Sequence, residues 1–168
     1  QIMDKMNFKH YMLKEIYDQP QTAKNWLENY LIKNSDNGQY QINYPFDTEF
    51  FESIERIEII ACGTSKHAAM VGSFLLEQFS GIPTNVFYAS EFRYAPPPLL
   101  PNTLTIGVTQ SGETADTIAA INMEIKRRSA VNDSKYKPNL IAITNRIESS
   151  IGRQITNIID IGAGIEIG

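Results

Sequence analysis

Two short stretches rich in hydroxyl side chains carry the chemistry that this sequence offers. They are Cys-Gly-Thr-Ser at residues 62–65 and Thr-Gln-Ser-Gly-Glu-Thr at residues 109–114. Each follows an apolar run and precedes a helical pattern, so both are expected at helix N-termini, where backbone N–H groups and the helix dipole attract an anion. Their neutral donors predict a site for a phosphate ester that carries sugar hydroxyls. The candidate binding residues are Thr64, Ser65, Thr109, Gln110, Ser111 and Thr114.

A plainer interpretation of both stretches stays open, because Ser and Thr are also ordinary N-cap residues. Two such stretches after two strands of one sheet favour binding over capping. Neither stretch is a Walker A loop, since no Gly-Lys-Ser/Thr occurs at the required spacing. A dinucleotide fingerprint is also excluded, because Gly63 has no second glycine two positions later.

Other candidate groups have simpler interpretations. Cys62 ends an apolar run and is expected to be a packed thiol. Glu113 is favoured by the dipole of the helix that it precedes. Glu91 and Arg93 could form a charge pair near the second stretch, but a structural or subunit-contact role is expected for them. The basic run at residues 126–128 is typical of a solvated helix end.

The elements that must position these loops follow from the alternation of apolar runs and helical patterns. Short hydrophobic strands that alternate with helices indicate βαβ units and a parallel sheet, and right-handed crossovers place helices on both faces. The predicted fold is a three-layer α-β-α sandwich with a five-stranded parallel sheet, doubly wound and flavodoxin-like. The expected strands are residues 57–61, 85–89, 104–108, 140–144 and 158–161, and the expected core helices are residues 65–80 and 114–128.

The chain before the first strand has a different pattern. Residues 13–32 show helical spacing, and Pro20 is expected to start a second helix, since proline suits a first helical turn. Residues 34–38 form a turn, and residues 39–46 are expected to be surface loop. The predicted domains are a linker remnant (1–12), N-terminal helices that pack on the core (13–52) and a sugar-phosphate-binding core (53–168).

Composition limits the class of protein. The chain has 168 residues, a formal net charge of −4 and 42% hydrophobic residues, which is ordinary for one globular domain. The acidic balance argues against a nucleic-acid partner, and no apolar run is long enough to predict a membrane span. One cysteine and two histidines leave no basis for a disulfide or a metal cluster. We therefore expect a cytoplasmic protein without a metal or a cofactor.

Several segments resemble the sugar isomerase (SIS) domain family. Residues 61–65, 89–94 and 110–117 carry the likeness, through the strings SEFRY and QSGETADT above all. More narrowly, the chain resembles the first SIS domain of the glutamine–fructose-6-phosphate aminotransferases. Residues 11–20 resemble the segment that follows the amidotransferase domain in that family, and residues 164–168 resemble a loop that continues there with Val-Ala-Ser. The resemblance implies that Thr64 and Ser65 contact the sugar, and that Thr109, Gln110, Ser111 and Thr114 bind the phosphate.

The resemblance also implies a reaction, in which fructose 6-phosphate and glutamine give glucosamine 6-phosphate. In that family a glutaminase domain and a second SIS domain supply the remaining groups, including a lysine, a glutamate and a histidine. The sequence begins with Gln1 and ends at Gly168 without counterparts of these domains. We therefore expect a piece of a longer, homodimeric enzyme that binds the sugar phosphate but does not catalyse.

Other interpretations stay open. The chain could be an SIS-type sugar-phosphate sensor or regulator, a stand-alone ketose/aldose phosphate isomerase, or a purely structural module. A stand-alone isomerase would need an acid/base pair, and the two loops contain none. A piece of a larger assembly is also expected to expose an apolar face, which we assign to residues 13–32.

Overall fold

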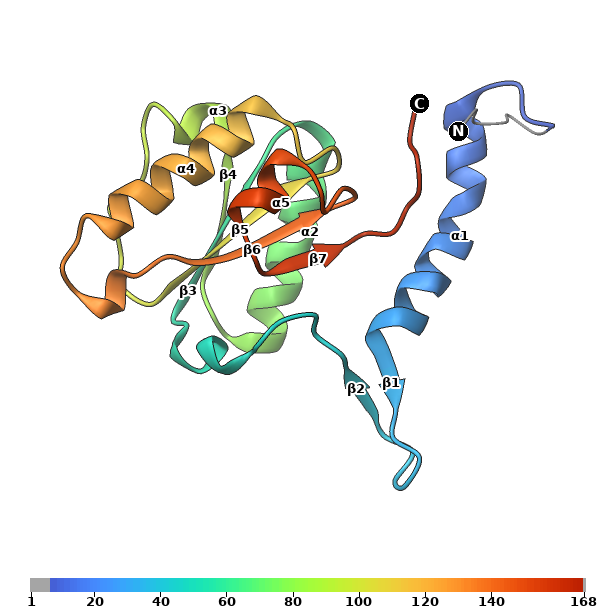
Figure 1. Cartoon of the computed structure of the whole chain (residues 1–168), viewed down its shortest axis with the longest axis horizontal. Coiled ribbons are helices and arrows are strands. Elements are labelled where there is room, and N and C mark those ends of the chain that lie inside the picture. Colours follow the sequence, from blue (N-terminus) through green and yellow to red (C-terminus); the bar gives the residue numbers. More distant parts are fainter. Residues whose placement is uncertain (1–6, 168) are drawn as a thin grey trace. The chain divides into compact units, whose positions relative to one another are not determined.

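The computed structural model describes residues 7–167 of the chain (Figure 1). It divides into two compact units, which we describe separately. Among the described residues, the first unit comprises residues 7–44 together with residues 161–167, and the second unit runs from Pro45 to Asp160. The six candidate binding residues all belong to the second unit.

The first unit consists of a long helix, a hairpin and the C-terminal segment. Helix α1 spans Tyr11–Tyr30, and strands β1 (Leu31–Lys33) and β2 (Tyr40–Ile42) pair antiparallel. Within this unit the backbone N–H of Ile167 donates to Glu15 Oε1 at 2.6 Å.

Two predictions for this unit were wrong. Pro20 lies inside α1 and does not begin a second helix. A proline there removes one backbone hydrogen bond, but side-chain pairs four residues apart support the helix on both sides of it, at Lys14–Asp18 and Lys24–Glu28. Residues 40–42, expected in a surface loop, form β2 instead.

A five-stranded parallel sheet is the centre of the second unit. The strands are β3 (Arg56–Ala61), β4 (Thr84–Tyr88), β5 (Thr103–Thr109), β6 (Asn139–Thr144) and β7 (Ile158–Asp160). Their order in the sheet is β4-β3-β5-β6-β7, and every neighbouring pair is parallel. The five predicted strands and the doubly wound fold class are confirmed, with strand ends that differ by a residue or so.

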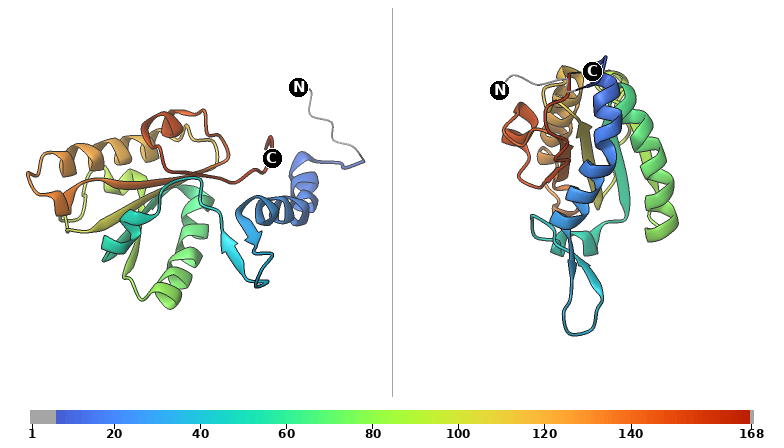
Figure 2. Two further views of the ribbon diagram at one scale, coloured as in Figure 1. Left: turned by 60° about the horizontal axis from the view of Figure 1, so that its bottom comes forward. Right: turned by 90° about the vertical axis from the view of Figure 1, so that its right-hand side faces the viewer.

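Helices cover both faces of this sheet (Figure 2). Helix α2 (Gly63–Ser80) lies on one face, where Ala69 and Leu76 pack against strand residues such as Ile59 and Ile106. The opposite face carries three helices, whose apolar side chains pack around Ile60. These are α3 (Ala89–Phe92), α4 (Ala115–Ser129) and α5 (Ser150–Gln154). Two 3-10 helices, Glu49–Ser53 and Ser134–Tyr136, complete the unit.

A buried ion cluster lies under α4, and it corrects the prediction that residues 126–128 are a solvated helix end. Arg128 is 1% exposed, and its Nε donates to Glu124 Oε1 at 2.6 Å. Its Nη2 lies 3.9 Å from Oε2 of Glu58 on β3, and its Nη1 donates to the carbonyl of Leu100 at 3.0 Å. The basic end of α4 therefore fixes the loop before β5 as well as the helix itself.

Candidate functional site

The two hydroxyl-bearing loops lie side by side at the carboxyl edge of the sheet. They follow β3 and β5, which are parallel neighbours with Ala61 in register with Val108. The helices that the loops enter, α2 and α4, cover opposite faces of the sheet. Ligands of open α/β sheets bind in the crevice at such a point. A contact of 3.9 Å between Thr117 Oγ1 and Cys62 Sγ joins the first turn of α4 to the first loop.

The first loop leaves its hydroxyl groups available. Cys62 is the N-cap residue of α2, packs against the apolar core and makes no side-chain cap bond. Gly63 has a φ of +54°, a conformation that favours glycine. Among the described residues, the side chains of Thr64 and Ser65 make no hydrogen bond, and Thr64 is exposed. Both hydroxyls and the first backbone N–H groups of α2 are therefore free to meet a ligand.

The second loop is bonded internally. Thr109 Oγ1 and Thr114 Oγ1 lie 2.9 Å apart, and the N–H of Gly112 donates to Thr109 Oγ1 at 3.2 Å. The N–H of Glu113 donates to Ser111 Oγ at 3.1 Å. Because Ser111 accepts this bond, its own hydroxyl proton remains available to an acceptor such as a phosphate oxygen.

The capping interpretation does not account for these hydroxyls. Thr114 is the N-cap residue of α4, yet its side chain makes no cap bond to the helix. The side chain of Gln110 has no hydrogen bond within the described part of the chain. The backbone carbonyl of Gln110 accepts from the backbone N–H of Asn145 at 3.0 Å.

The segment between β6 and α5 packs against the second loop and supports it. Gly112 has a φ of +66°, and a Cβ at this position would lie 1.8 Å from Ser149 Oγ. The carboxylate of Glu113 accepts from the backbone N–H of Ser150 at 2.8 Å and from its hydroxyl at 2.6 Å. These hydrogen bonds lower the pKa of Glu113. Glu113 thus joins the second loop to the start of α5.

Charged side chains flank the site without entering the loops. Arg93 Nη1 pairs with Asp116 in the first turn of α4 at 2.5 Å and not with Glu91, the alternative that the sequence left open. Lys66, in the first turn of α2, places its Nζ 3.7 Å from the ring centre of Tyr88, which is a cation–π contact.

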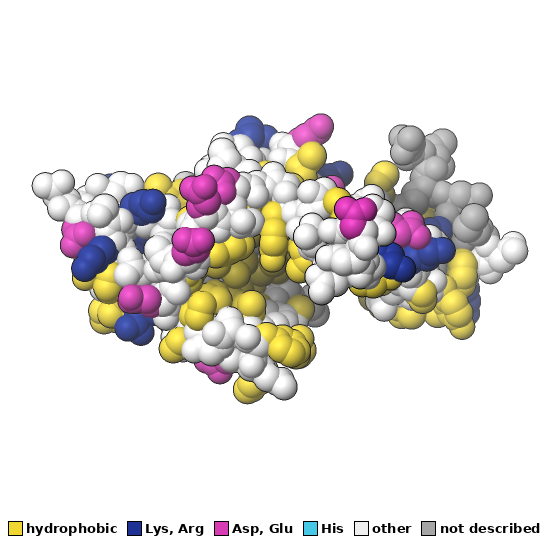
Figure 3. Space-filling view, turned by 90° about the horizontal axis from the view of Figure 1, so that it is seen from below, with side chains coloured by type: hydrophobic (Ala, Val, Ile, Leu, Met, Phe, Trp, Pro, Cys, Tyr) yellow, Lys and Arg dark blue, Asp and Glu magenta, His cyan; other side chains and the backbone are white. Residues whose placement is uncertain are grey.

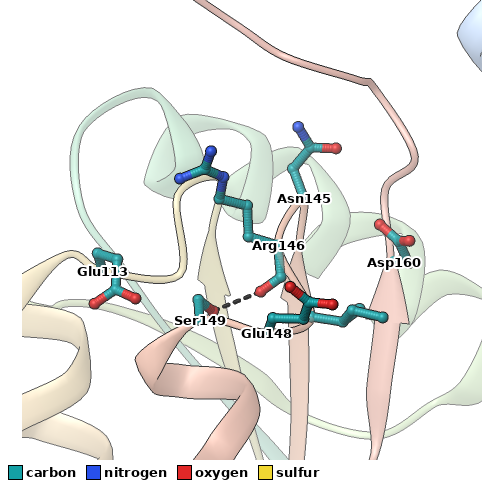
Figure 4. A pocket seen from close by; sticks show the side chains of 7 residues that line it. Glu113, Asn145, Arg146, Glu148, Ser149 and Asp160 are labelled. Atoms are coloured by element: carbon teal, nitrogen blue, oxygen red, sulfur yellow. Dashed lines mark hydrogen bonds between the residues drawn. The ribbon is translucent and has the colours of Figure 1, made fainter. Parts of the chain in front are cut away.

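A cavity of about 480 Å³ opens beside the second loop (Figure 4). None of the six candidate residues lines it. Its side chains include three carboxylates and one guanidinium, a balance that does not favour a phosphate group. The sequence pattern did not indicate this cavity, although Asn145 directly follows β6 and therefore lies at the carboxyl edge of the sheet. The lining residues are Glu113, Asn145, Arg146, Ile147, Glu148, Ser149 and Asp160.

Two further classes of feature are absent from residues 7–167. Within that range, no group of three or more His, Cys, Asp or Glu side chains could hold a metal ion. No helix in the same range has the length and apolar character needed to cross a membrane.

Comparison with curated proteins gives closely similar relatives. The chain is 57% identical to the glutamine–fructose-6-phosphate aminotransferase (isomerizing) of Thermosynechococcus vestitus and 51% identical to that of a Synechocystis strain. Each match covers 99% of this chain but 27% of the relative, so the chain spans about a quarter of the length of these relatives.

Comparison with solved structures also gives a match to an aminotransferase of this kind. The C-terminal domain of glucosamine-fructose-6-phosphate aminotransferase from Francisella tularensis matches with a TM-score of 0.82 and 33% identity, over 99% of this chain and 43% of that one. The glucosamine-6-phosphate deaminase of Thermotoga maritima shares the fold, with a TM-score of 0.66 at 21% identity over 91% of this chain and 40% of that one. The family model described as SIS domain matches residues 50–168. The chain therefore belongs to the SIS domain family.

Proposed function

We propose that the chain is the phosphosugar-binding SIS domain of an aminotransferase that makes glucosamine 6-phosphate from fructose 6-phosphate and glutamine. One observation carries this proposal, namely that two hydroxyl-rich loops meet at the carboxyl edge of the sheet with donors not used in capping. The names of its relatives support the substrate and the reaction. Because the chain spans 27% of those relatives, the activity is proposed for a longer protein.

The two loops would divide the ligand between them. The second loop would bind the phosphate through the hydroxyls of Thr109, Ser111 and Thr114, the amide of Gln110 and the N-terminus of α4. Thr64 and Ser65 of the first loop would then contact the sugar hydroxyls. Fixing the phosphate holds the carbonyl carbon in one position, which lowers the entropic cost of the later chemical steps. This chain would contribute that orientation, while the proton transfers belong to groups outside it.

Calorimetric titration with fructose 6-phosphate, glucosamine 6-phosphate and inorganic phosphate tests this proposal. The wild type is compared with Ser111→Ala/Thr114→Ala, and both sugar phosphates are expected to bind the wild type and to lose about 30-fold or more in affinity in the variant. A matched control, Ser129→Ala/Ser134→Ala, removes two hydroxyls at the opposite end of α4. Equal losses in the two variants, or wild-type binding that survives in the loop variant, would reject the site.

A further inference from the structure

The second loop and the first turn of α4 bring two carboxylates to a site proposed for an anion. Residues 109–117 contain Glu113 and Asp116 but no lysine or arginine. A phosphate monoester carries a charge of about −1.5 to −2 at pH 7, and a carboxylate within a Debye length of it, about 8 Å, repels it. The chain as a whole does not offset this repulsion, because its formal net charge is −4. On the face shown in Figure 3, basic and acidic side chains are interspersed and no large basic patch gathers.

One of the two carboxylates is bound by groups of α5. Glu113 accepts from the N–H and the hydroxyl of Ser150 at 2.8 and 2.6 Å. Nη2 of Arg153 donates to the same hydroxyl at 2.8 Å, so a positive charge lies behind this carboxylate. The charge of Glu113 is therefore already compensated by its contacts with α5.

The other carboxylate is paired from α3. Asp116 lies in the first turn of α4, two residues after the N-cap residue Thr114. Arg93 is the C-cap residue of α3, and its Nη1 lies 2.5 Å from Oδ1 of Asp116. The two residues are 23 positions apart in the sequence, so the fold and not a local pattern brings them together. Among residues 7–167, neither side chain has a second ion-pair partner.

The packing of α3 keeps Arg93 near this carboxylate. Phe92 is 1% exposed, and its ring lies edge-on to that of Phe87 with the ring centres 5.4 Å apart. The guanidinium carbon of Arg93 lies 5.7 Å from the ring centre of Tyr94. Because its neighbour in the chain is fixed in the core, Arg93 loses less conformational entropy in pairing than an arginine on a free loop would.

We propose that Arg93 is a positioning residue for the phosphate group, which acts through Asp116 and does not touch the ligand. By compensating the charge of Asp116, it allows the N-terminus of α4 to attract a dianion. The side chains of the pair are 37% and 40% exposed, so solvent screens their charges. The expected effect on affinity is therefore about 5-fold. This inference rests on the proposed function, because it concerns the same phosphate site.

A charge effect and a purely structural pair predict different signs. If the pair only holds the first turn of α4 in place, its loss from either side should weaken ligand binding. If the charges matter, Arg93→Gln leaves a negative charge near the phosphate and weakens binding. Asp116→Asn then leaves a positive charge and strengthens it.

Calorimetric titration with inorganic phosphate and fructose 6-phosphate at low salt tests these signs. Arg93→Gln should lower the affinity about 5-fold and Asp116→Asn should raise it about 3-fold, while the double variant should return to within about 2-fold of the wild type. Arg93→Lys keeps the charge and should also stay within about 2-fold. Because salt screens exposed charges, the differences should shrink at about 0.5 M salt, which a structural defect would not do.

A matched control removes a positive charge from the other end of the same helix. Lys126 is exposed in the last turn of α4, about 15 Å along the helix from Asp116. Lys126→Gln should therefore bind both ligands like the wild type. A loss equal to that of Arg93→Gln would show an effect of net charge alone and overturn the role of Arg93.

The remaining outcomes separate this inference from the proposed function. A wild type that binds neither ligand rejects the phosphate site, and the role of Arg93 with it. A wild type that binds while the variants of the pair all match it overturns the role of Arg93 alone. Weaker binding by Asp116→Asn, or by the double variant as much as by Arg93→Gln, would do the same, since both are the results of a structural pair.

Discussion

The two loops at the carboxyl edge of the sheet have similar compositions but different internal structure. The hydroxyls of the first loop, Thr64 and Ser65, make no hydrogen bond among the described residues. Thr109, Ser111 and Thr114 of the second loop are held by bonds within the loop. Two further contacts, through Ser149 and Ser150, support the second loop from behind. The difference indicates that hydrogen bonds within the second loop hold its hydroxyls in place, whereas the hydroxyls of Thr64 and Ser65 in the first loop are not held by any such bond.

The largest expected effect is on the unfolding free energy, when the glycine in each loop is replaced by alanine. Both Gly63 and Gly112 have positive φ, but a Cβ on Gly63 would meet nothing within 4 Å, whereas one on Gly112 would lie 1.8 Å from Ser149 Oγ. Gly112→Ala is therefore expected to cost about 3 kcal/mol of unfolding free energy, and Gly63→Ala about 1 kcal/mol, from backbone strain alone. Urea denaturation measures both values. Equal costs would show that the second loop is not tightly supported.

The second prediction compares the contributions of the two loops to binding. Thr64→Ala/Ser65→Ala should reduce the affinity for fructose 6-phosphate about 5-fold, less than the roughly 30-fold loss expected for Ser111→Ala/Thr114→Ala, because the free hydroxyls must first be ordered. The first-loop variant should leave the unfolding free energy within about 0.5 kcal/mol of the wild type, since no bond is lost. Calorimetry and urea denaturation measure the two quantities. A larger affinity loss for the first-loop variant would reverse the assignment of the phosphate to the second loop.

The third prediction concerns a carboxylate at the other end of the same sheet. Burial raises the pKa of Glu58 from its ordinary value of 4.5 to about 6, with a further contribution from Glu124 that Arg128, Arg127 and Arg56 oppose. Between pH 4.5 and 6, the folded state therefore keeps a proton on Glu58 that the unfolded state has lost. The protonated carboxyl favours the folded state, and this contribution to the unfolding free energy is lost as pH rises from 4.5 through 6.

The variant Glu58→Gln measures the size of this effect. It stays neutral, so its unfolding free energy should match that of the wild type near pH 4.5 and exceed it by about 2 kcal/mol above pH 6. Urea denaturation at several pH values gives the difference between the two proteins. A difference that does not change with pH would contradict the raised pKa.

The sequence predicted the sheet and the position of the loops, for physical reasons. Runs such as residues 57–61 are short, apolar and bounded by polar turns, and a parallel order brings their ends to one edge. Helices α3 and α5, of four and five residues, are shorter than the window that a helical period needs. The short hairpin strand at residues 40–42 has no buried residue, so no alternating apolar pattern revealed it.

Contacts between residues distant in sequence were beyond the same reasoning. Arg128 is buried because Glu58, seventy positions earlier, lies across from it on β3. The support of the second loop depends likewise on Ser149 and Ser150, which no local pattern connects to Gly112 and Glu113. Residue types therefore predicted that the two hydroxyl-rich loops lie at one edge of the sheet, but not which of their side chains are held by hydrogen bonds.

The smallest expected effect tests the link between the second loop and α5. Hydrogen bonds from the hydroxyl and N–H of Ser150 lower the pKa of Glu113, and the positive charges of Arg153 and Arg146 lower this pKa further. A carboxylate with a lowered pKa stabilises the fold above its unfolded value of 4.5, and this contribution is lost as pH falls through the folded value. Glu58 has the opposite dependence, so the two carboxylates can be separated by pH. In a Glu58→Gln background, Glu113→Gln should lower the melting temperature slightly at pH 7 and by progressively less below pH 4.5. A pH-independent shift would mean that the ionised carboxylate does not hold the loop, and that the hydrogen bonds within the loop and the packing around Gly112 distinguish it from the first loop.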